Sequence, residues 1–451
     1  MMTSPKGMMR LGAHFHPTGH HVAAWLHPET DKDAPVNFRH YVRATQTAER
    51  ARFDFMFLAD AVAMREANLA GLSRWPQYVA YFEPLTLLSG LAAVTERIGL
   101  AATCSTAFTE PYNLARYFAS LDHISEGRAA WNVVTTSNPA AAWNFGREKL
   151  EAHGDRYAQA REFVDVVCGL WDSWDDDAFP RDRETGVYFD PTKLHVLRHK
   201  GEHFAVRGPL NVARSPQGRP VIVQAGGSEA GRELAAETAE VVFTIPNTLA
   251  QAQEFYTDVK RRLAKYGRAP EQLKILPSLN PIVSETSDEA EAKFQFLQSK
   301  VHEDVGRVLL AGELGGMDLF DLPVDSSFPI ERLQHIVDAG QTHFGKAVEI
   351  IQRDHPTIRE LYLRYAAARG ALPIRGTPAQ IADLMQHWFE SGAGDGFMIA
   401  FSHLPGGLDD FARLVIPELQ RRGLFRTEYE GATLRENLGL ARPASRYAAA
   451  G

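Results

Sequence analysis

The chain has 451 residues, a formal net charge of −8 and an apolar content of 45%. This acidic balance, with basic residues scattered among acidic ones, excludes a typical nucleic-acid-binding protein. Two cysteines, Cys104 and Cys168, are too few for a disulfide framework and do not match a zinc-binding pattern. Because we find no apolar leader segment and no apolar run of membrane-spanning length, we expect a cytoplasmic globular protein that does not bind membranes.

Short apolar runs alternate with amphipathic stretches along most of the chain, which is typical of a parallel sheet with crossover helices. The runs that we expect to form strands are residues 11–15, 53–58, 98–104, 129–134, 220–224, 241–244, 275–283 and 396–401. Helical patterns cover residues 38–51, 84–95, 112–124, 155–174, 229–239, 248–266, 287–303, 378–391 and 408–423. Eight strand–helix units predict an α/β fold of the (β/α)₈ barrel type.

Three long segments interrupt the predicted barrel, which we otherwise expect to form one domain over residues 1–451. They follow the second, fourth and seventh strands and comprise residues 61–83, 175–219 and 304–376. Within them, residues 193–206 have the pattern of a β-hairpin, and residues 329–338 and 343–368 are helical. Loops of this length are usually lids or oligomer contacts, and we expect 61–83 and 304–376 to act as lids.

A glycine-rich turn, Gln224-Ala225-Gly226-Gly227-Ser228, lies between the expected strand at 220–224 and the helix at 229–239. Glycine allows a close approach of ligand to backbone, and the free N–H groups of a first helical turn attract an anion. The pattern therefore predicts a phosphate cradle, although a structural turn capped by Ser228 has the same sequence. A second helix start at 152–157 favours the phosphate interpretation, because both could face one site.

The other expected strand ends carry mostly neutral hydrogen-bonding groups. A barrel places its site at the carboxyl ends of its strands, so these side chains should surround one mouth. They suit a planar heterocycle with many donors and acceptors better than a hydrolytic pair of carboxylates. The residues are His14, His16, Asp60, Ser105, Thr106, Asn132, the run 135–138, Ser402 and His403.

A metal-dependent hydrolase of the amidohydrolase type is the competing interpretation. His14 and His16 lie on one face of an extended strand, and His20 and His21 follow closely. Such a centre also needs histidines at later strand ends and a carboxylate after the last strand. The expected fifth and sixth strands provide no histidine, and the last gives Ser402 and His403 without an aspartate. We therefore predict no metal site, because two histidines alone make an incomplete centre.

Several motifs together resemble the flavin-dependent monooxygenases of the bacterial-luciferase superfamily. Within it, the chain is most similar to the group that contains nitrilotriacetate, EDTA and dibenzothiophene-sulfone monooxygenases. The resemblance covers nearly the whole chain. It rests on residues 53–60 (FDFMFLAD), 110–116 (EPYNLAR), 121–128 (LDHISEGR), 131–136 (WNVVTT), 153–157 (HGDRY), 214–218 (RSPQG), 224–228 (QAGGS) and 429–440 (YEGATLRENLGL).

The resemblance implies an eight-stranded barrel that binds FMN as reduced FMNH₂, with O₂ as co-substrate. It implies that Asp60 and Thr106 lie by the isoalloxazine ring, with Asn132 beneath or beside it. His153 and Tyr157 would hold the ribityl-phosphate side. Gly227 and Ser228 would contact the phosphate, in agreement with the anion cradle inferred above.

The resemblance also implies a two-component enzyme, with a separate NAD(P)H:FMN reductase supplying the reduced flavin. The reaction would oxidise a small organic substrate with cleavage of a C–N or C–S bond, in an aminopolycarboxylate, a sulfone or a thioether. His14, His16 and His21 are the candidates for substrate or proton-transfer contacts, and relatives of this kind form homodimers or homotetramers. Two alternatives within the superfamily are a flavin-binding protein without turnover and a deazaflavin-dependent reductase.

Overall fold

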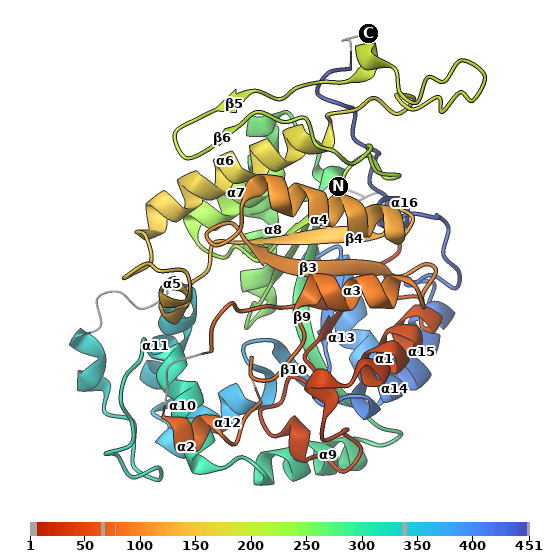
Figure 1. Ribbon diagram of the computed structural model, residues 1–451. Coiled ribbons are helices and arrows are strands. Elements are labelled where there is room, and N and C mark those ends of the chain that lie inside the picture. Colours follow the sequence, from red (N-terminus) through yellow and green to blue (C-terminus); the bar gives the residue numbers. More distant parts are fainter. Residues whose placement is uncertain (1–6, 65–67, 77, 336–340, 449–451) are drawn as a thin grey trace.

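The computed structural model describes residues 7–64, 68–76, 78–335 and 341–448. Its main feature is a closed ring of eight parallel strands, in the order β1-β2-β3-β4-β7-β8-β9-β11, with β11 paired again to β1 (Figure 1). The strands are β1 (Arg10–Phe15), β2 (Phe55–Leu58), β3 (Gly99–Ser105), β4 (Ala129–Val134), β7 (Val221–Gln224), β8 (Val241–Thr244), β9 (Lys274–Val283) and β11 (Gly396–Ala400). The predicted (β/α)₈ barrel is confirmed, and every predicted strand is present.

Helices follow the strands and cover the outside of the ring (Figure 1). Those over the barrel are α1 (Phe38–Arg50), α3 (Pro84–Ala92), α4 (Pro111–Ile124), α6 (His153–Trp171), α7 (Glu229–Thr238), α8 (Leu249–Arg262), α9 (Ser287–Ser299), α13 (Pro378–Glu390), α14 (Gly406–Asp410) and α15 (Ile416–Arg421), the last two joined by a π-helical turn at Phe411–Val415. Capping residues in the sequence set the points at which these helices begin. At α13, for example, Thr377 and Gln380 form a reciprocal capping box and Pro378 occupies the first helical position.

The barrel interior is filled by apolar side chains, and its amino-terminal end is closed by the carboxyl-terminal segment. Phe55, Phe57 and Met398 pack inside the ring against Leu434 and Leu438, which come from α16 (Leu434–Asn437) and the residue after it. The backbone N–H of Leu434 donates to the carbonyl of Gly127, just before β4. Because this end is plugged, the accessible mouth is the one at the carboxyl ends of the strands.

The longest predicted insert carries its own apolar cluster beside the barrel. It contains α10 (Glu303–Glu313), the 3₁₀ turn Ile330–His335, α11 (Gln341–Asp354) and α12 (Ile358–Ala368), and α10 also packs on α2 (Leu69–Leu72) (Figure 1). The helix predicted over 343–368 is interrupted at Pro356, which has no N–H to donate. Residues 336–338 of the predicted helix 329–338 lie outside the described residues.

One strand in this region was not predicted. β10 (Leu372–Gly376) runs parallel to β9 outside the ring. Its sequence alternates half-buried and exposed side chains because it covers the barrel on one face only.

The predicted hairpin over 193–206 is confirmed in shorter form. Two-residue strands β5 (His199–Lys200) and β6 (Ala205–Val206) pair antiparallel. The hairpin lies over α6 (Figure 1), and the remaining short elements are the 3₁₀ turns Ala24–Leu26, Ala34–Val36, Pro191–Lys193, Leu263–Tyr266 and Pro270–Gln272, and α5 (Ala140–Asn144). No helix in the described part of the chain is long and apolar enough to cross a membrane.

Candidate active site

A cavity of about 340 Å³ opens at the carboxyl ends of β2, β3, β4 and β7. This volume lies within the range of small-molecule and cofactor pockets. Its walls are residues 60–62, Thr103, Ser105, 133–138 and 224–226, with Tyr78, Ala141 and Tyr157 from the surrounding loops and helices. The predicted convergence of strand ends on one mouth is therefore present for four strands.

The wall formed by β3 and β4 is a network of uncharged groups. Asn132 donates from Nδ2 to Thr103 Oγ1 at 2.9 Å, and Ser105 Oγ lies 2.6 Å from Thr136 Oγ1. Thr136 has a φ of +52°, a strained conformation for a β-branched residue that is often associated with functional sites. Asn132 Oδ1 is buried and has no hydrogen-bond partner among the described residues, so it can accept from a ligand.

Thr106 occupies a different position from its neighbours in this wall. Its hydroxyl donates to the carbonyl of Val134 at 3.3 Å, and its side chain is buried. Ser105 and Thr103 line the cavity instead. Any contribution of Thr106 to a ligand is therefore through the shape of the β3–β4 edge.

Among the described residues, Asp60 is the single carboxylate in the cavity lining, and it is bonded to a tyrosine of the first insert. The Tyr81 hydroxyl donates to Asp60 Oδ1 at 2.6 Å and itself accepts from the N–H of Ala61 at 3.1 Å. Burial raises the pKa of Asp60 above its ordinary value, while the hydrogen bond from Tyr81 opposes that rise. The carboxylate is thus fixed in orientation at the end of β2.

The glycine-rich turn after β7 is packed tightly onto the first turn of α7. Ser228 caps the helix by accepting from the N–H of Gly231 at 3.2 Å. A Cβ on Gly226 would lie 2.8 Å from the backbone of Gly231, so only glycine fits there. The hydroxyl of Tyr157 is 3.1 Å from the position of a Cβ on Gly231, which brings the start of α6 beside the start of α7.

The first turn of α6 adds polar groups to this end of the cavity. The rings of His153 and Tyr157 lie with centroids 4.8 Å apart. Arg156 is partly buried, and its Nε is buried without a partner in the part of the chain that the structure describes. Of these residues, Tyr157 lines the cavity, whereas the His153 side chain is exposed. The two adjacent helix beginnings bring free N–H groups to this end of the cavity.

Histidines gather at the end of β1. The ring of His20 lies 4.3 Å from that of His14 and 5.6 Å from that of His16, measured between centroids, and Tyr78 is 5.8 Å from His16. Nε2 of His14, Nε2 of His16 and Nδ1 of His20 are buried and have no hydrogen-bond partner within the described ranges. Unsatisfied buried nitrogens of this kind are rare and require a ligand or a functional explanation.

These imidazoles are neutral at physiological pH. Burial, with the charge of Arg369 as the next cause, lowers the pKa of His14 to about 3. Burial also holds the pKa values of His16 and His20 well below 6.5. A neutral imidazole offers one donor and one acceptor, so the cluster is suited to hydrogen bonding with a ligand.

His21 is oriented differently from the cluster. Its Nδ1 accepts from the N–H of Ala23 at 3.1 Å, and its Nε2 lies 3.3 Å from Gln298 Oε1. Both ring nitrogens therefore have partners, and burial lowers the pKa of His21 to about 4. The ring that packs against His14 and His16 is therefore that of His20, not that of His21.

Residues 15–395 match the model of the luciferase-like monooxygenase family. The chain belongs to this family. Family membership makes the protein an enzyme of the monooxygenase class, as predicted, and the barrel mouth described above is where such an enzyme acts.

Relatives in this family align over nearly the whole chain. N-acetyl-S-(2-succino)cysteine monooxygenase of Bacillus subtilis is 49% identical, over 99% of this chain and 100% of its own. Nitrilotriacetate monooxygenase component A of Aminobacter aminovorans is 48% identical, over 96% of this chain and 97% of its own. A crystal structure of riboflavin lyase with modified FMN and riboflavin superposes with a TM-score of 0.86 at 30% identity, over 97% of each chain.

The cavity of this luciferase-like monooxygenase fits a flavin mononucleotide by its own features. The buried oxygens Asn132 Oδ1 and Gln224 Oε1 lack partners among the residues that the structure describes, and both lie beside or within the cavity wall. The Gly226 turn leads into the start of α7, where the free N–H groups of a first helical turn can bind an anion.

Sequence reasoning missed several groups at this mouth. Thr103 positions Asn132, Tyr81 positions Asp60, and Arg369 acts on the histidines from the end of α12. Thr103 faces inward because it is two residues before Ser105 on β3, and that alternation could have identified it. Tyr81 and Arg369 come from the inserts, whose path the sequence pattern does not give.

Proposed function

We propose that this protein is the oxygenating component of a two-component, FMNH₂-dependent monooxygenase. The observation that carries the proposal is the cavity of neutral hydrogen-bonding groups that ends at the Gly226 cradle, in a chain of the luciferase-like monooxygenase family. FMN has two matching parts, because its planar ring needs neutral hydrogen-bonding groups and its phosphate needs free N–H groups.

In this proposal the cavity wall binds the flavin ring and the paired helix starts bind the phosphate. Asn132 and Asp60 contact the isoalloxazine, with Thr106 supporting the wall behind it. Tyr157 and His153 contact the ribityl-phosphate side, and the N–H groups after Gly227 and Ser228 bind the phosphate. The partly buried Arg156 adds a positive charge there.

Bound FMNH₂ supplies the two electrons with which one atom of O₂ becomes water while the other atom enters the substrate. The protein's own groups hold the reactants in place and exclude water. Oxygen insertion at a carbon next to nitrogen or sulfur gives a product that breaks into an oxygenated carbon fragment and a leaving group. The leaving group is an amine from a C–N bond, a thiol from a thioether and a sulfinate from a sulfone.

The reduced flavin has to come from a separate protein, and we propose an NAD(P)H:FMN reductase as this partner. One relative is named a component A, which supports a two-component system for this chain. We also propose a homodimer or homotetramer in the cytoplasm, where NAD(P)H is available. The division into one barrel with inserts at 61–83, 175–219 and 304–376 belongs to the same proposal.

The substrate would lie between the flavin and the histidines. His14 and His16 provide buried nitrogens without partners, and His20 extends this surface. We propose that these nitrogens bind polar groups of the substrate, whereas His21 acts by fixing the loop after β1. An aminopolycarboxylate substrate has the acceptor atoms that such N–H groups require.

Two measurements test this proposal. FMN titration should show binding by the native protein and weaker binding by Tyr157→Phe and Ser228→Ala. With NADH and a flavin reductase, ¹⁸O₂ should label the product of one substrate from a panel of aminopolycarboxylates, sulfones and thioethers. Unchanged FMN affinity in both variants would contradict the binding site, and unlabelled products throughout would contradict the reaction.

A further inference from the structure

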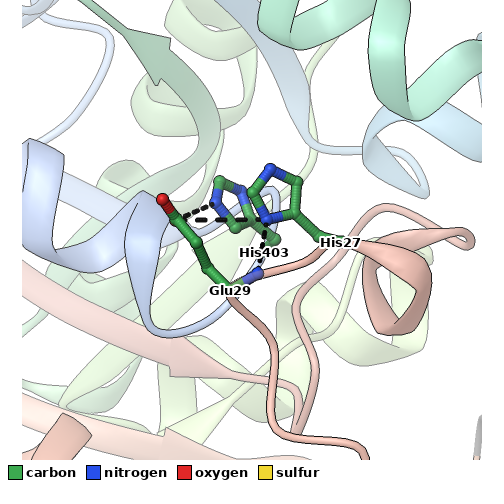
Figure 2. A group of neighbouring side chains, drawn as sticks. All are labelled: His27, Glu29 and His403. Carbon is green, nitrogen blue, oxygen red and sulfur yellow. Dashed lines mark hydrogen bonds and ion pairs between the residues drawn. The ribbon is translucent and has the colours of Figure 1, made fainter.

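Two loops on the mouth side of the barrel bring three metal-binding side chains together, away from the proposed flavin site. His27 and Glu29 belong to the loop after β1, and His403 follows β11. Figure 2 shows the Glu29 carboxylate facing both rings, with dashed lines to a nitrogen of each. Among the described residues, this is the group of His, Cys, Asp and Glu side chains that brings three ligand atoms within 4.8 Å of one another.

The distances are close to those around one small divalent cation. His403 Nε2 lies 3.3 Å from Glu29 Oε2, and His27 Nδ1 lies 4.0 Å from the same oxygen. Tetrahedral ligands at about 2.1 Å from zinc are separated by about 3.4 Å. Of the three ligand pairs, His403–Glu29 already matches this spacing, and His27–Glu29 requires a movement of about half an ångström by an exposed side chain. The ligand nitrogens of His27 and His403 lie within 4.8 Å of each other.

We propose that His27, Glu29 and His403 bind a divalent cation of the zinc class. Two imidazoles and one carboxylate are a common zinc ligand set, and the fourth position faces solvent because the Glu29 side chain is 62% exposed. Binding replaces the 3.3 Å bond that His27 Nδ1 accepts from the N–H of Glu29.

The surroundings prepare these groups for a cation. Ser402 Oγ lies 3.2 Å from His403 Nδ1, so this nitrogen can carry the proton and leave Nε2 free to bind metal. A Cβ on Gly406 would lie 2.0 Å from the Glu29 carboxylate, so glycine keeps that oxygen beside His403.

The charged groups that face the cluster come from α9 and α14. Lys293 on α9 lies near His27, but it is paired with Asp410 at 2.5 Å. Asp409 lies near enough to Glu29 for the two charges to interact. Asp409 is also influenced by Arg43 and Arg50, and Arg413 pairs with Asp410 at 3.2 Å, so basic groups already balance these carboxylates. The ligand geometry, and not an excess of negative charge, therefore favours a cation at this site.

A metal at this site would join two loops that already contact each other. The N–H of His20 donates to the carbonyl of Phe401 at 2.7 Å, and the N–H of Leu404 donates to the carbonyl of Thr18 at 2.9 Å. The loop after β1 carries His16 and His20 into the mouth, so the cation is a structural clamp on the loop that bears them. In this role the cation takes no part in the reaction with the flavin.

Zinc binding tests the proposal directly. Metal-free native protein, prepared by dialysis against a chelator, should bind one equivalent of Zn²⁺ alone, measured by calorimetry, and Co²⁺ should give the absorption bands of a low-coordinate site. Glu29→Gln, which changes an exposed side chain, should lower the affinity at least about tenfold. His403→Gln should abolish stoichiometric binding.

His199→Gln is the matched control, because His199 also pairs with a carboxylate, Glu162, at 2.9 Å but has no third ligand in the part of the chain that the structure describes. It should bind one equivalent of Zn²⁺ like the native protein. If the native protein binds none, or if Glu29→Gln binds Zn²⁺ with native affinity, the proposed site is wrong. Should His403→Gln not fold, the Glu29→Gln result alone decides.

A stability measurement tests the clamp. At a hundredfold excess over the native Kd, Zn²⁺ should raise the melting temperature of the native protein by about 3 °C, and that of Glu29→Gln by no more than about half as much. An equal rise in Glu29→Gln would overturn the clamp. The affinity for FMN should be the same with and without Zn²⁺, so failure of this site is distinguishable from failure of the flavin site.

Discussion

On the β3–β4 side of the barrel mouth, polar side chains are bonded to one another, and Asn132 Oδ1 is left to accept from a ligand. At the end of β1, by contrast, one buried nitrogen of each of three imidazoles has no partner among the described residues. Ser105 meets Thr136, and Asn132 meets Thr103. His14, His16 and His20 contact one another mainly through their rings. A prearranged network is suited to one cofactor that is always the same, because it loses little freedom on binding. Unpaired groups are suited to a ligand that supplies the missing bonds.

Because of this difference, we expect mutations on the two sides of the mouth to affect two separate properties, FMN binding and substrate turnover. Changes on the β3–β7 side should weaken FMN binding and so affect every reaction. Changes in the histidine cluster should affect the substrate and leave FMN affinity intact. We call these two sides the flavin half and the histidine half of the mouth, and each can be impaired by mutation without the other.

The largest effect should come from Gly226→Ala. The added Cβ would lie 2.8 Å from the backbone of Gly231, so β7 and the start of α7 must separate. Overpacking of this kind costs about 1–3 kcal/mol, which corresponds to about tenfold to a hundredfold in FMN affinity if the cradle carries the loss. Fluorescence titration of FMN measures it.

Gly345→Ala is the control for this variant, since a Cβ there meets nothing within 4 Å. It should bind FMN like the native protein. Equal FMN affinity in Gly226→Ala and Gly345→Ala would show that the turn after β7 does not hold the phosphate.

The next effect concerns the histidine half. His14→Asn removes a buried nitrogen that the proposed substrate would bond, and we expect kcat/KM to fall about tenfold. The Kd for FMN should not change. Steady-state kinetics with the reductase and an FMN titration check the two halves of this statement. An exposed histidine, His387, provides the control as His387→Asn. A parallel loss of FMN affinity in His14→Asn would mean that the two halves are not separate.

The neutral histidines also predict acid sensitivity of the fold. Burial lowers the pKa of His14 to about 3, and His16 and His20 are shifted in the same direction, whereas the unfolded chain titrates near 6.5. The unfolded state therefore binds more protons below pH 6.5, and stability is complete above that pH and falls below it. Each histidine contributes a slope on the order of 1.4 kcal/mol per pH unit.

Urea denaturation between about pH 8 and about pH 5.5 measures this slope. The free energy of unfolding should decrease less steeply with acidification in His14→Asn than in the native protein. Identical slopes would show that the imidazole of His14 is not held neutral by burial.

The barrel was predictable because its strands are short apolar runs with fixed spacing. Runs such as 129–134 and 220–224 are buried on both faces, so their composition and length identified them without knowledge of the rest of the chain. The family was identified by motifs at the strand ends, and the family match confirms it. β10 was missed because its five residues alternate burial within an insert that has no barrel spacing.

The candidate site was predictable only where the barrel itself positions a residue. Asn132 and Asp60 follow from strand ends, but Tyr81, Arg369 and Glu29 reach the mouth through loops whose path depends on tertiary packing. Whether His20 or His21 joins the cluster of His14 and His16 depends on which ring has a partner elsewhere. Gln298, which is far away in sequence, contacts His21 and so keeps it out of the cluster. No local pattern contains that information.

The smallest effect should come from Tyr81→Phe, which tests how the first insert supports the flavin half. The variant removes the 2.6 Å bond that the hydroxyl donates to Asp60, and this bond lowers the pKa of that carboxyl. Without it the pKa of Asp60 rises further, so the acid limb of the kcat/KM profile should move to higher pH. FMN affinity should fall by only about threefold, because one hydrogen bond in a network is lost. An unchanged acid limb would mean that Asp60 does not need to be ionised, and the flavin half would then depend on its neutral groups alone.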